Sequence, residues 1–195
     1  MAYPTGTEIK AVLVESASVK MATADIYADA IIDAAQMIAD ALAQGGKVML
    51  CGNGGSAGDA QHIAAEFVAT LDHRRPRGGL AALALTTDTS FITAYANDFG
   101  FEGIFQRQVE ALGREGDVLI GISTSGNSAN VVAAFATART AGIKTIGFTG
   151  EGGGKLAPLS DMLFAVPSGK TMHIQEAHIA LGHVLTMAVE QILGY

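Results

Sequence analysis

The sequence predicts an α/β protein with three layers, in which helices cover both faces of a five-stranded parallel sheet. Short apolar runs alternate with longer segments of helical periodicity from Lys47 to the end of the chain. The apolar runs are rich in β-branched residues, as strands buried on both faces usually are. Glycine is abundant at 24 residues and tryptophan is absent, which suits a fold with many tight turns between strands and helices.

Length and composition indicate one globular domain. A chain of 195 residues with 49% hydrophobic content can bury a substantial core. We expect a single domain over residues 1–195. Within it, a helical segment at 1–45 would pack against other subunits, and an α/β core would occupy 46–195.

Charge, cysteine content and the N-terminus restrict the classes of function and location. A formal net charge of −7 argues against a nucleic-acid-binding surface. The single cysteine, Cys51, excludes an intramolecular disulfide. The first residues are too polar for a signal peptide, and no apolar run approaches the length of a membrane span. We therefore expect a soluble, cytoplasmic protein with neither a nucleic acid nor a membrane as partner.

Two helices are expected before the first strand. Apolar residues recur at helical spacing over Thr7–Met21 and again over Ala24–Ala43, after which Gly45 and Gly46 provide the stop. This is more helix than one face of the sheet needs. The high alanine content suits close contact with the helices of another subunit.

The core follows as strands and helices in alternation. The predicted strands are Lys47–Cys51, Leu80–Leu85, Asp117–Gly121, Ile143–Thr149 and Met162–Val166. The predicted helices are Ala57–Leu71, Thr86–Ala96, Phe101–Leu112, Ala129–Ala141 and Met172–Leu193, with a turn at Gly150–Gly154. Ligands of such sheets bind at the carboxyl ends of the strands, so the loops after the strands are where a site is expected.

The loop after the third strand, Ile122–Ser128 (ISTSGNS), has the composition of an anion site. The first N–H groups of the helix that follows lack partners within the helix, and the helix dipole is positive there. Gly126 allows a close backbone approach, and neutral hydroxyl donors come from Ser123, Thr124, Ser125 and Ser128. With no Lys or Arg in the loop, the expected ligand is one compact phosphate monoester. The alternative is that Ser and Asn only cap a helix.

The loop after the first strand, Cys51–Ser56 (CGNGGS), is the second candidate. It lacks the third glycine and the acidic residue of a dinucleotide-binding fingerprint, so a Rossmann cofactor is a weak interpretation. Gly54 and Gly55 would allow the backbone to approach a sugar, with Asn53 and Ser56 as hydrogen-bonding groups. The alternative is a tight turn without a ligand.

The helix after that loop carries His62 and Glu66. A spacing of four places both on one helical face, within reach of one metal ion or one substrate atom. Surface helices contain many such pairs, so a solvated face is the alternative.

The last helix contains Gln175 and His183 in an otherwise apolar segment. A histidine on an apolar face is more often a satisfied core residue than a ligand. The two are eight residues apart, or ~12 Å along a continuous helix, which is too far to bind one ion from a straight helix. Either Gln175 precedes the helix proper, or the two residues belong to the sites of different subunits.

Three further features have weaker signals. Asn97 and Asp98 are either a helix stop or polar contacts to a substrate. The basic run His73–Arg77 is expected to be a solvated loop, although one of its arginines could reach a phosphate. Cys51 has no evident paired base, so we do not expect a cysteine nucleophile.

These motifs together resemble one family. CGNGGS, the following His-x-x-x-Glu, AYANDFGFEGIF, LGREGDVLIGISTSGNSANV and IQEAHIALGH look like the bacterial sedoheptulose 7-phosphate isomerases (phosphoheptose isomerases) of the SIS sugar-phosphate domain family. The match runs from about Gly45 to the end of the chain, and the N-terminal helices also fit. The resemblance implies a flavodoxin-like SIS domain with two extra N-terminal helices and a long C-terminal helix.

The resemblance implies an aldose–ketose isomerase that converts sedoheptulose 7-phosphate into D-glycero-D-manno-heptose 7-phosphate for lipopolysaccharide or capsule. It implies a homotetramer with active sites at subunit boundaries and one Zn²⁺ per subunit. The implied metal ligands are His62, Glu66, Gln175 and His183. Glu66 would be the base and His183 the partner acid/base. The implied substrate contacts are Asn53, Gly54, Gly55, Ser56, Glu66, Asn97, Asp98, Ser123, Thr124, Ser125, Ser128 and Gln175.

The sequence departs from some relatives just before IQE, where they have an Asp-Arg pair and this chain has Met172 and His173. A mechanism that needs a further carboxylate there is therefore in question. One alternative is a non-catalytic SIS relative that binds the DnaA replication initiator, but such a protein would be expected to have lost Glu66 and His183. Another SIS sugar-phosphate isomerase is the second alternative, although those usually carry extra domains or a different loop.

Overall fold

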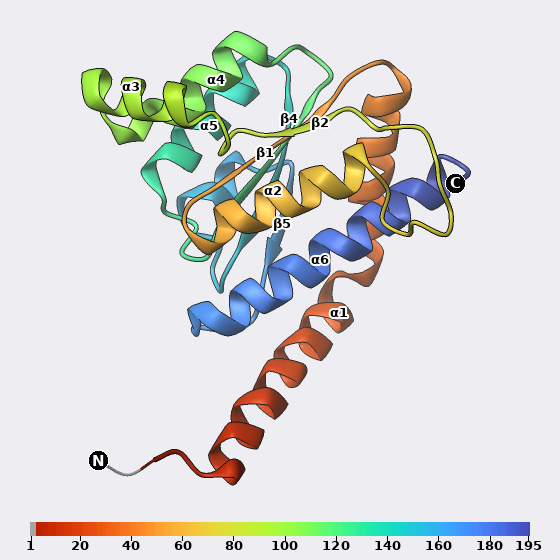
Figure 1. The fold of residues 1–195 in the computed structure, drawn as a ribbon, viewed down its shortest axis with the longest axis vertical. Coiled ribbons are helices and arrows are strands. Elements are labelled where there is room, and N and C mark those ends of the chain that lie inside the picture. The colour runs from red at the N-terminus through yellow and green to blue at the C-terminus, as the bar shows by residue number, and fades with distance from the viewer. Residues whose placement is uncertain (1–2) are drawn as a thin grey trace.

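The computed structural model describes residues 3–195, so residues 1–2 of the predicted domain lie outside the described residues. Its centre is a five-stranded sheet in the order β2-β1-β3-β4-β5, with every neighbouring pair parallel (Figure 1). The strands are β1 (Val48–Gly52), β2 (Ala82–Ala84), β3 (Val118–Ser123), β4 (Lys144–Thr149) and β5 (Met162–Ala165). The predicted parallel sheet is confirmed, in the strand order of flavodoxin-like folds.

The helices of residues 3–195 lie close to their predicted places. They are α1 (Gly6–Ala43), α2 (Gly55–Val68), α3 (Thr89–Phe99), η1 (Phe101–Gly103), α4 (Ile104–Leu112), α5 (Ala129–Thr140), η2 (Gly154–Leu159) and α6 (Thr171–Ile192). η1 and η2 are short 3-10 helices. The turn predicted after β4 therefore continues into η2, and the helix predicted at Phe101–Leu112 begins with a 3-10 turn. None of these helices is long and apolar enough to cross a membrane.

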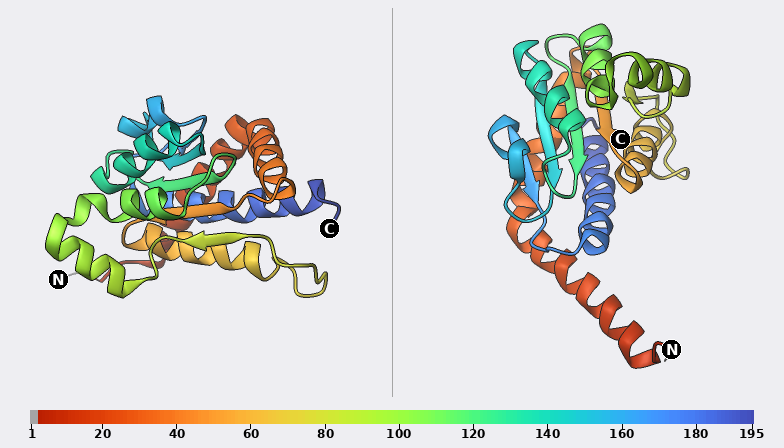
Figure 2. Two further views of the ribbon diagram at one scale, coloured as in Figure 1. Left: turned by 90° about the horizontal axis from the view of Figure 1, so that it is seen from above. Right: turned by 90° about the vertical axis from the view of Figure 1, so that its left-hand side faces the viewer.

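The two faces of the sheet form two hydrophobic cores. Successive residues of a strand point to opposite faces, so Val48 and Leu50 pack with α1, α2 and α6, while Met49 and Cys51 pack with α4 and α5. Figure 2 shows the sheet between these two helical layers. Every residue of β1 and β3 is buried, as expected for central strands covered on both sides. The predicted three-layer α/β/α architecture is confirmed.

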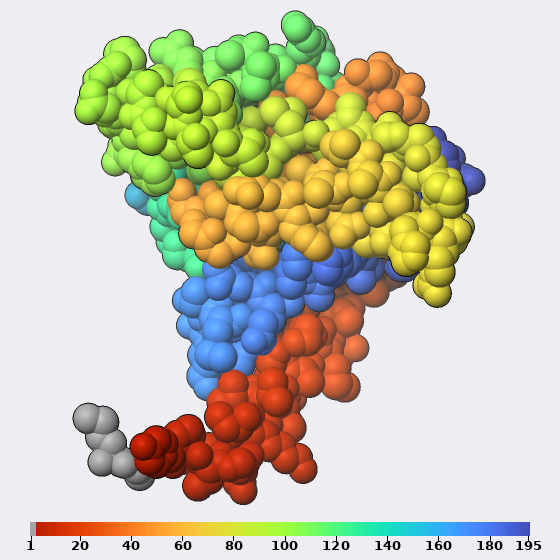
Figure 3. Space-filling model, in the orientation of Figure 1, coloured from red at the N-terminus to blue at the C-terminus, as the bar shows by residue number. Residues whose placement is uncertain are grey.

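The N-terminal segment is one helix, so the prediction of two separate helices is wrong. α1 runs without interruption from Gly6 to Ala43. The junction expected near Ala22 contains no proline or glycine, and Thr23 donates its hydroxyl hydrogen to the carbonyl of Val19 one turn earlier. A shift in the apolar pattern does not by itself break a helix, because the backbone can keep every hydrogen bond. Figure 3 shows the N-terminal half of α1 standing out from the body of the molecule.

A buried carboxylate joins the two central strands at their amino ends. Asp117 precedes β3, and its side chain is 2% exposed. It accepts hydrogen bonds from the backbone N–H groups of Lys47 and Arg114 and from the ammonium group of Lys47. Lys47 precedes β1, so this ion pair fastens the edge of the sheet opposite to the candidate ligand loops.

Candidate functional site

The two loops singled out in the sequence lie side by side at the carboxyl edge of the sheet. One follows β1 and the other follows β3, and these strands are paired in register from Val48↔Val118 onward. The side chains of Asn53 and Asn130 exchange two hydrogen bonds of 2.9 Å, each amide donating to the other's oxygen. The loops are therefore held together by side chains as well as by the sheet.

The hydroxyl-rich loop divides into an inner and an outer part. Ser123 is 3% exposed, and its Oγ lies 2.9 Å from the Oγ of Ser128. Ser125 is exposed, and its Oγ accepts a hydrogen bond from the backbone N–H of Asn127 at 3.1 Å. Gly126 has a φ of +66°, and a Cβ there would lie 2.1 Å from the carbonyl oxygen of Gly153. Only glycine allows the two loops to meet this closely.

A cavity of about 320 Å³ opens beside this loop, lined by Thr124, Ser125, Glu151, Ser168, Gly169, Thr171 and Ile174. Of the predicted hydroxyls, Thr124 and Ser125 face it directly. The sequence did not point to three polar residues of this lining, which are Glu151, Ser168 and Thr171. The last two could have been predicted. Ser168 follows β5 at the carboxyl edge, and Thr171 is the first residue of α6, both being places where this fold binds ligands.

Gln175 lies within α6 and not before it, so the first of the two interpretations considered for this residue is wrong. The helix is continuous from Thr171. The side-chain amide of Gln175 packs on Gly55 at the start of α2, where an added Cβ would lie 2.5 Å from Nε2. Within one chain, Gln175 therefore belongs with the CGNGGS loop.

Three side chains converge between α2 and α6. The Nε2 atoms of His62 and His183 lie 2.8 Å apart, and the Nε2 of His62 lies 3.3 Å from Oε1 of Glu66. One ligand atom from each of the three residues lies within 4.8 Å of the other two. The pairing of His62 with Glu66 follows from their spacing of four on one helix. The approach of His183 comes from the packing of the two helices.

Gly182 explains how the helices come so close. A Cβ at this position would lie 2.5 Å from Cδ1 of Ile63, and 2.6 Å from its Cγ1. Ile63 and Gly182 are the chain neighbours of His62 and His183, so a close contact between the helices lies next to the convergent side chains. A glycine in the middle of a helix is unfavourable by roughly 1 kcal/mol relative to alanine, and here it makes room for the facing helix.

The chemistry of this cluster suits a divalent cation. Two imidazole nitrogens and a carboxylate form one of the donor sets of catalytic zinc sites. One turn earlier on α2, the Oδ2 of Asp59 is buried and has no hydrogen-bond partner in residues 3–195. Burial raises the pKa of Asp59, while the nearby charges of His62 and His183 lower it. A carboxylate beside two imidazoles adds negative charge, which favours a cation between them.

The remaining candidates lie elsewhere. Asn97 and Asp98 are exposed near the end of α3 and are hydrogen-bonded to each other at 2.8 Å. α3 packs on η1 and α4, away from α6 (Figure 1), so one chain does not bring this pair to the cluster.

Cys51 is fully buried, and burial raises the pKa of its thiol to about 12. A thiol of that pKa is not a nucleophile near neutral pH.

His178 on α6 is a buried histidine outside the cluster. Its ring lies against Phe148, and its Nε2–H donates to the carbonyl of Thr149 at 2.9 Å. Its Nδ1 is buried, and residues 3–195 offer it no hydrogen-bond partner. Burial lowers the pKa of His178 to about 4, although the bond to Thr149 partly opposes the shift.

We expect His178 to make stability depend on pH between about 4 and 6.5. In this range the unfolded chain binds a proton at His178 and the folded chain does not. The free energy of unfolding should therefore decrease as the pH falls, by roughly 3 kcal/mol at pH 4. Urea titrations of the wild type and His178→Gln, which cannot titrate, isolate this contribution. Equal pH dependence in the two proteins would contradict the buried neutral imidazole.

Comparison with known proteins establishes the relationship. The model of the SIS domain matches residues 14–150. A phosphoheptose isomerase from Aquifex aeolicus (strain VF5) is 54% identical over 186 residues, covering 95% of this chain and 96% of that protein. The structure of a phosphoheptose isomerase from Francisella tularensis has a TM-score of 0.91 at 38% identity, with 97% of this chain and 100% of that chain covered. One from Neisseria gonorrhoeae has a TM-score of 0.89 at 44% identity, with 95% and 98% covered. The chain therefore belongs to the phosphoheptose isomerase family of SIS-domain proteins.

Proposed function

We propose that this protein is a cytoplasmic aldose–ketose isomerase that converts sedoheptulose 7-phosphate into D-glycero-D-manno-heptose 7-phosphate. The reaction would be the first step toward ADP- or GDP-linked heptoses for lipopolysaccharide or capsule. The observation that carries the proposal is the convergence of His62, Glu66 and His183 between α2 and α6. The names of its relatives, phosphoheptose isomerases at 54% identity, support the class of substrate.

We propose Zn²⁺ as the ion of the cluster, held by His62, Glu66 and His183. When bound, it would polarise the sugar carbonyl and stabilise negative charge on its oxygen. Gln175 is the fourth candidate ligand, but in its own chain it lies against Gly55. A fourth bond from Gln175 would therefore come from a neighbouring copy.

The proton transfers are assigned to residues of the cluster. Isomerisation moves a proton between C1 and C2 through an enediol, which needs a base near carbon and a second group to exchange protons with oxygen. Glu66 is the proposed base, because a carboxylate that gives one oxygen to a metal keeps the other free. Its side chain is 18% exposed, so it is partly shielded from water and still accessible. His183 is the proposed partner acid/base.

The phosphate is assigned to the hydroxyl-rich loop and the start of α5. Thr124 and Ser125 face the adjoining cavity, and the N-terminus of α5 begins immediately after Ser128. Helix N–H groups and neutral hydroxyls can bind a phosphate without a cationic side chain. Glu151 lies in the same lining, so these neutral donors must outweigh its repulsion of an anion. Asn53, Gly54, Gly55 and Ser56 are the proposed sugar contacts.

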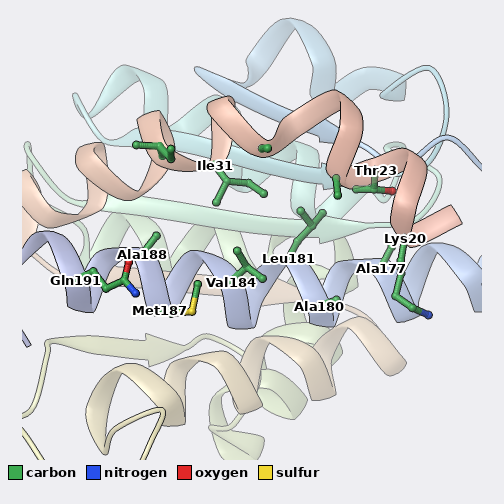
Figure 4. A pocket seen from close by; sticks show the side chains of 13 residues that line it. Lys20, Thr23, Ile31, Ala177, Ala180, Leu181, Val184, Met187, Ala188 and Gln191 are labelled. Atoms are coloured by element: carbon green, nitrogen blue, oxygen red, sulfur yellow. The ribbon is translucent and has the colours of Figure 1, made fainter. Parts of the chain in front are cut away.

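A homotetramer with sites at subunit boundaries completes the proposal. An apolar groove of about 400 Å³ runs between α1 and α6, and it includes Ile31, Leu181 and Val184 (Figure 4). The segment 1–45 also exposes large apolar side chains such as Leu13, at 65% exposure. Apolar surface of this extent is typical of interfaces. A second copy would also bring its Asn97 and Asp98 to the cluster, which a single chain does not do.

Proton NMR of the purified protein with sedoheptulose 7-phosphate in heavy water tests the proposal. We expect signals of an aldose heptose 7-phosphate, with deuterium at C2 to the extent that the base exchanges its proton with solvent. A zinc chelator should abolish turnover, and added Zn²⁺ should restore it. The absence of turnover with zinc supplied would contradict the proposed function.

Replacing Glu66 by glutamine should lower kcat by roughly 10²-fold or more, since the amide cannot accept the carbon-bound proton. Circular dichroism and size-exclusion chromatography should show an unchanged fold and assembly. Glu110→Gln, at a partly exposed glutamate of α4, is the matched control and should retain full activity. Near-normal turnover by Glu66→Gln would remove Glu66 from the mechanism.

Replacing Ser125 by alanine should raise KM by roughly tenfold, with a smaller effect on kcat, because a hydrogen bond to the charged phosphate is lost. Thr140→Ala is the control, since it removes an exposed hydroxyl at the other end of α5. Steady-state kinetics of both variants provide the comparison. An unchanged KM for Ser125→Ala would argue against the phosphate assignment.

A further inference from the structure

The side chain of Arg77, in the loop between α2 and β2, is buried. The expectation of a solvated loop for His73–Arg77 holds for Arg74, whose side chain is 80% exposed. It is wrong for Arg77, whose side chain is 1% exposed. A guanidinium keeps its charge at all ordinary pH values and is seldom buried without partners, so its partners indicate its role.

The guanidinium of Arg77 joins the end of α2 to α6. Its Nη2 donates to the carbonyl of Glu66 at 2.9 Å, and its Nη1 donates to the carbonyl of Phe67 at 2.9 Å. Its Nε donates to Oε1 of Glu190 on α6 at 2.6 Å. The same Oε1 accepts the backbone N–H of Leu71, just beyond α2, at 3.2 Å. One side chain therefore binds both helices that form the cluster.

These contacts exclude Arg77 as a phosphate ligand. A fourth hydrogen bond runs from Nη1 to the carbonyl of Gly78 at 2.9 Å, so four of the five N–H groups of the guanidinium are in use. The side chain also has almost no surface left for a ligand to contact. Its function must be exerted through the groups that it binds.

We propose that Arg77 is a positioning residue for the candidate site, which sets the carboxylate of Glu66 against His183. The last carbonyls of a helix lack partners, and a cation there matches the negative end of the helix dipole. The planar fork of arginine holds four hydrogen bonds here in fixed directions, whereas a lysine ammonium has only three donors on a single atom. The proposal rests on the proposed function, because that function gives the position of Glu66 its meaning.

The test compares two variants with two controls. Arg77→Met removes the charge and all four bonds, and Arg77→Lys keeps the charge but not the fork. Arg74→Met removes an exposed arginine of the same loop. Asp117→Asn weakens a buried ion pair at the opposite edge of the sheet, so it should lower stability without touching α2 or α6.

Cobalt(II) binding to the metal-free proteins, followed by its visible absorption, reports the geometry of the cluster. Turnover of sedoheptulose 7-phosphate reports the reaction. Both are measured at a temperature at which circular dichroism shows each protein folded. If neither Arg77 variant folds, Glu190→Gln replaces them. It removes the charge that pairs with Arg77 on α6 and so weakens the link between the helices, while its amide oxygen keeps the buried Nε–H hydrogen-bonded.

We expect both Arg77 variants to bind cobalt at least roughly tenfold more weakly and to lose kcat by a similar factor. Mutation of residues that hold metal ligands in place commonly has effects of this size. KM should change little, because the cavity lined by Thr124 and Ser125 adjoins the start of α6, whereas Arg77 binds Glu190 near the end of that helix. Arg74→Met and Asp117→Asn should keep the wild-type cobalt affinity. The failure of Arg77→Lys to restore it, despite the retained charge, separates positioning from general stability.

Two outcomes would overturn the role of Arg77: wild-type cobalt affinity and kcat in the Arg77 variants, or an equal loss in Asp117→Asn. Results on the wild type show separately whether the proposed function itself fails. A wild type that binds cobalt but does not turn over the sugar phosphate refutes the function and leaves the metal comparison to decide the role of Arg77. If the wild type isomerises the sugar phosphate without binding cobalt, the kcat and KM of the Arg77 variants and their controls decide the role of Arg77. A wild type that does neither overturns both.

Discussion

The close, parallel contact between α2 and α6 is the constraint on which the candidate site depends. Both helices begin at the carboxyl edge of the sheet and meet at successive levels about two turns apart. Gly55 lies against Gln175, Ile63 lies against Gly182, and the end of α2 is bound to Glu190 through an arginine and a backbone N–H. These three contacts hold the two helices in one alignment. Sliding or rotation of either helix would therefore separate the three convergent side chains. The cluster is a product of helix packing.

The proposed phosphate site depends on local groups and not on a charged surface. The chain has a net charge of −7, so a phosphate gains nothing from the protein's overall field. In the proposed site, helix N-termini and neutral hydroxyls at the carboxyl edge would supply the positive potential locally. The buried ion pair of Lys47 with Asp117 lies at the amino edge, opposite to the candidate ligand loops. The proposed binding loops and this structural ion pair therefore lie at opposite edges of one parallel sheet.

The apolar surface of α1 connects the fold of one chain to its proposed assembly. Only part of α1 contributes to the core that it forms with α2 and α6 on one face of the sheet. Its N-terminal half stands out from the body of the molecule (Figure 3). A helix with exposed apolar residues such as Leu13 and Met21 is stable in water when another surface covers them. The same assembly would bring Gln175 and the end of α3 toward a neighbouring cluster. Subunit packing and site formation are thus expected to be one event.

The sequence by itself determined the fold class, the order of the strands along the chain, both loops and the pairing of His62 with Glu66. These follow from local periodicity and glycine placement, which act over a few residues and can be read directly. Only the tertiary structure decided that α1 is one helix, that the His183 of the same chain lies against the pair, and that the side chain of Arg77 is buried. The family resemblance implied His183 as a ligand but not which subunit supplies it. The distance between α2 and α6 depends on which side chains meet across them, and residues far apart in sequence, such as Ile63 and Gly182, leave no periodic signal of their contact.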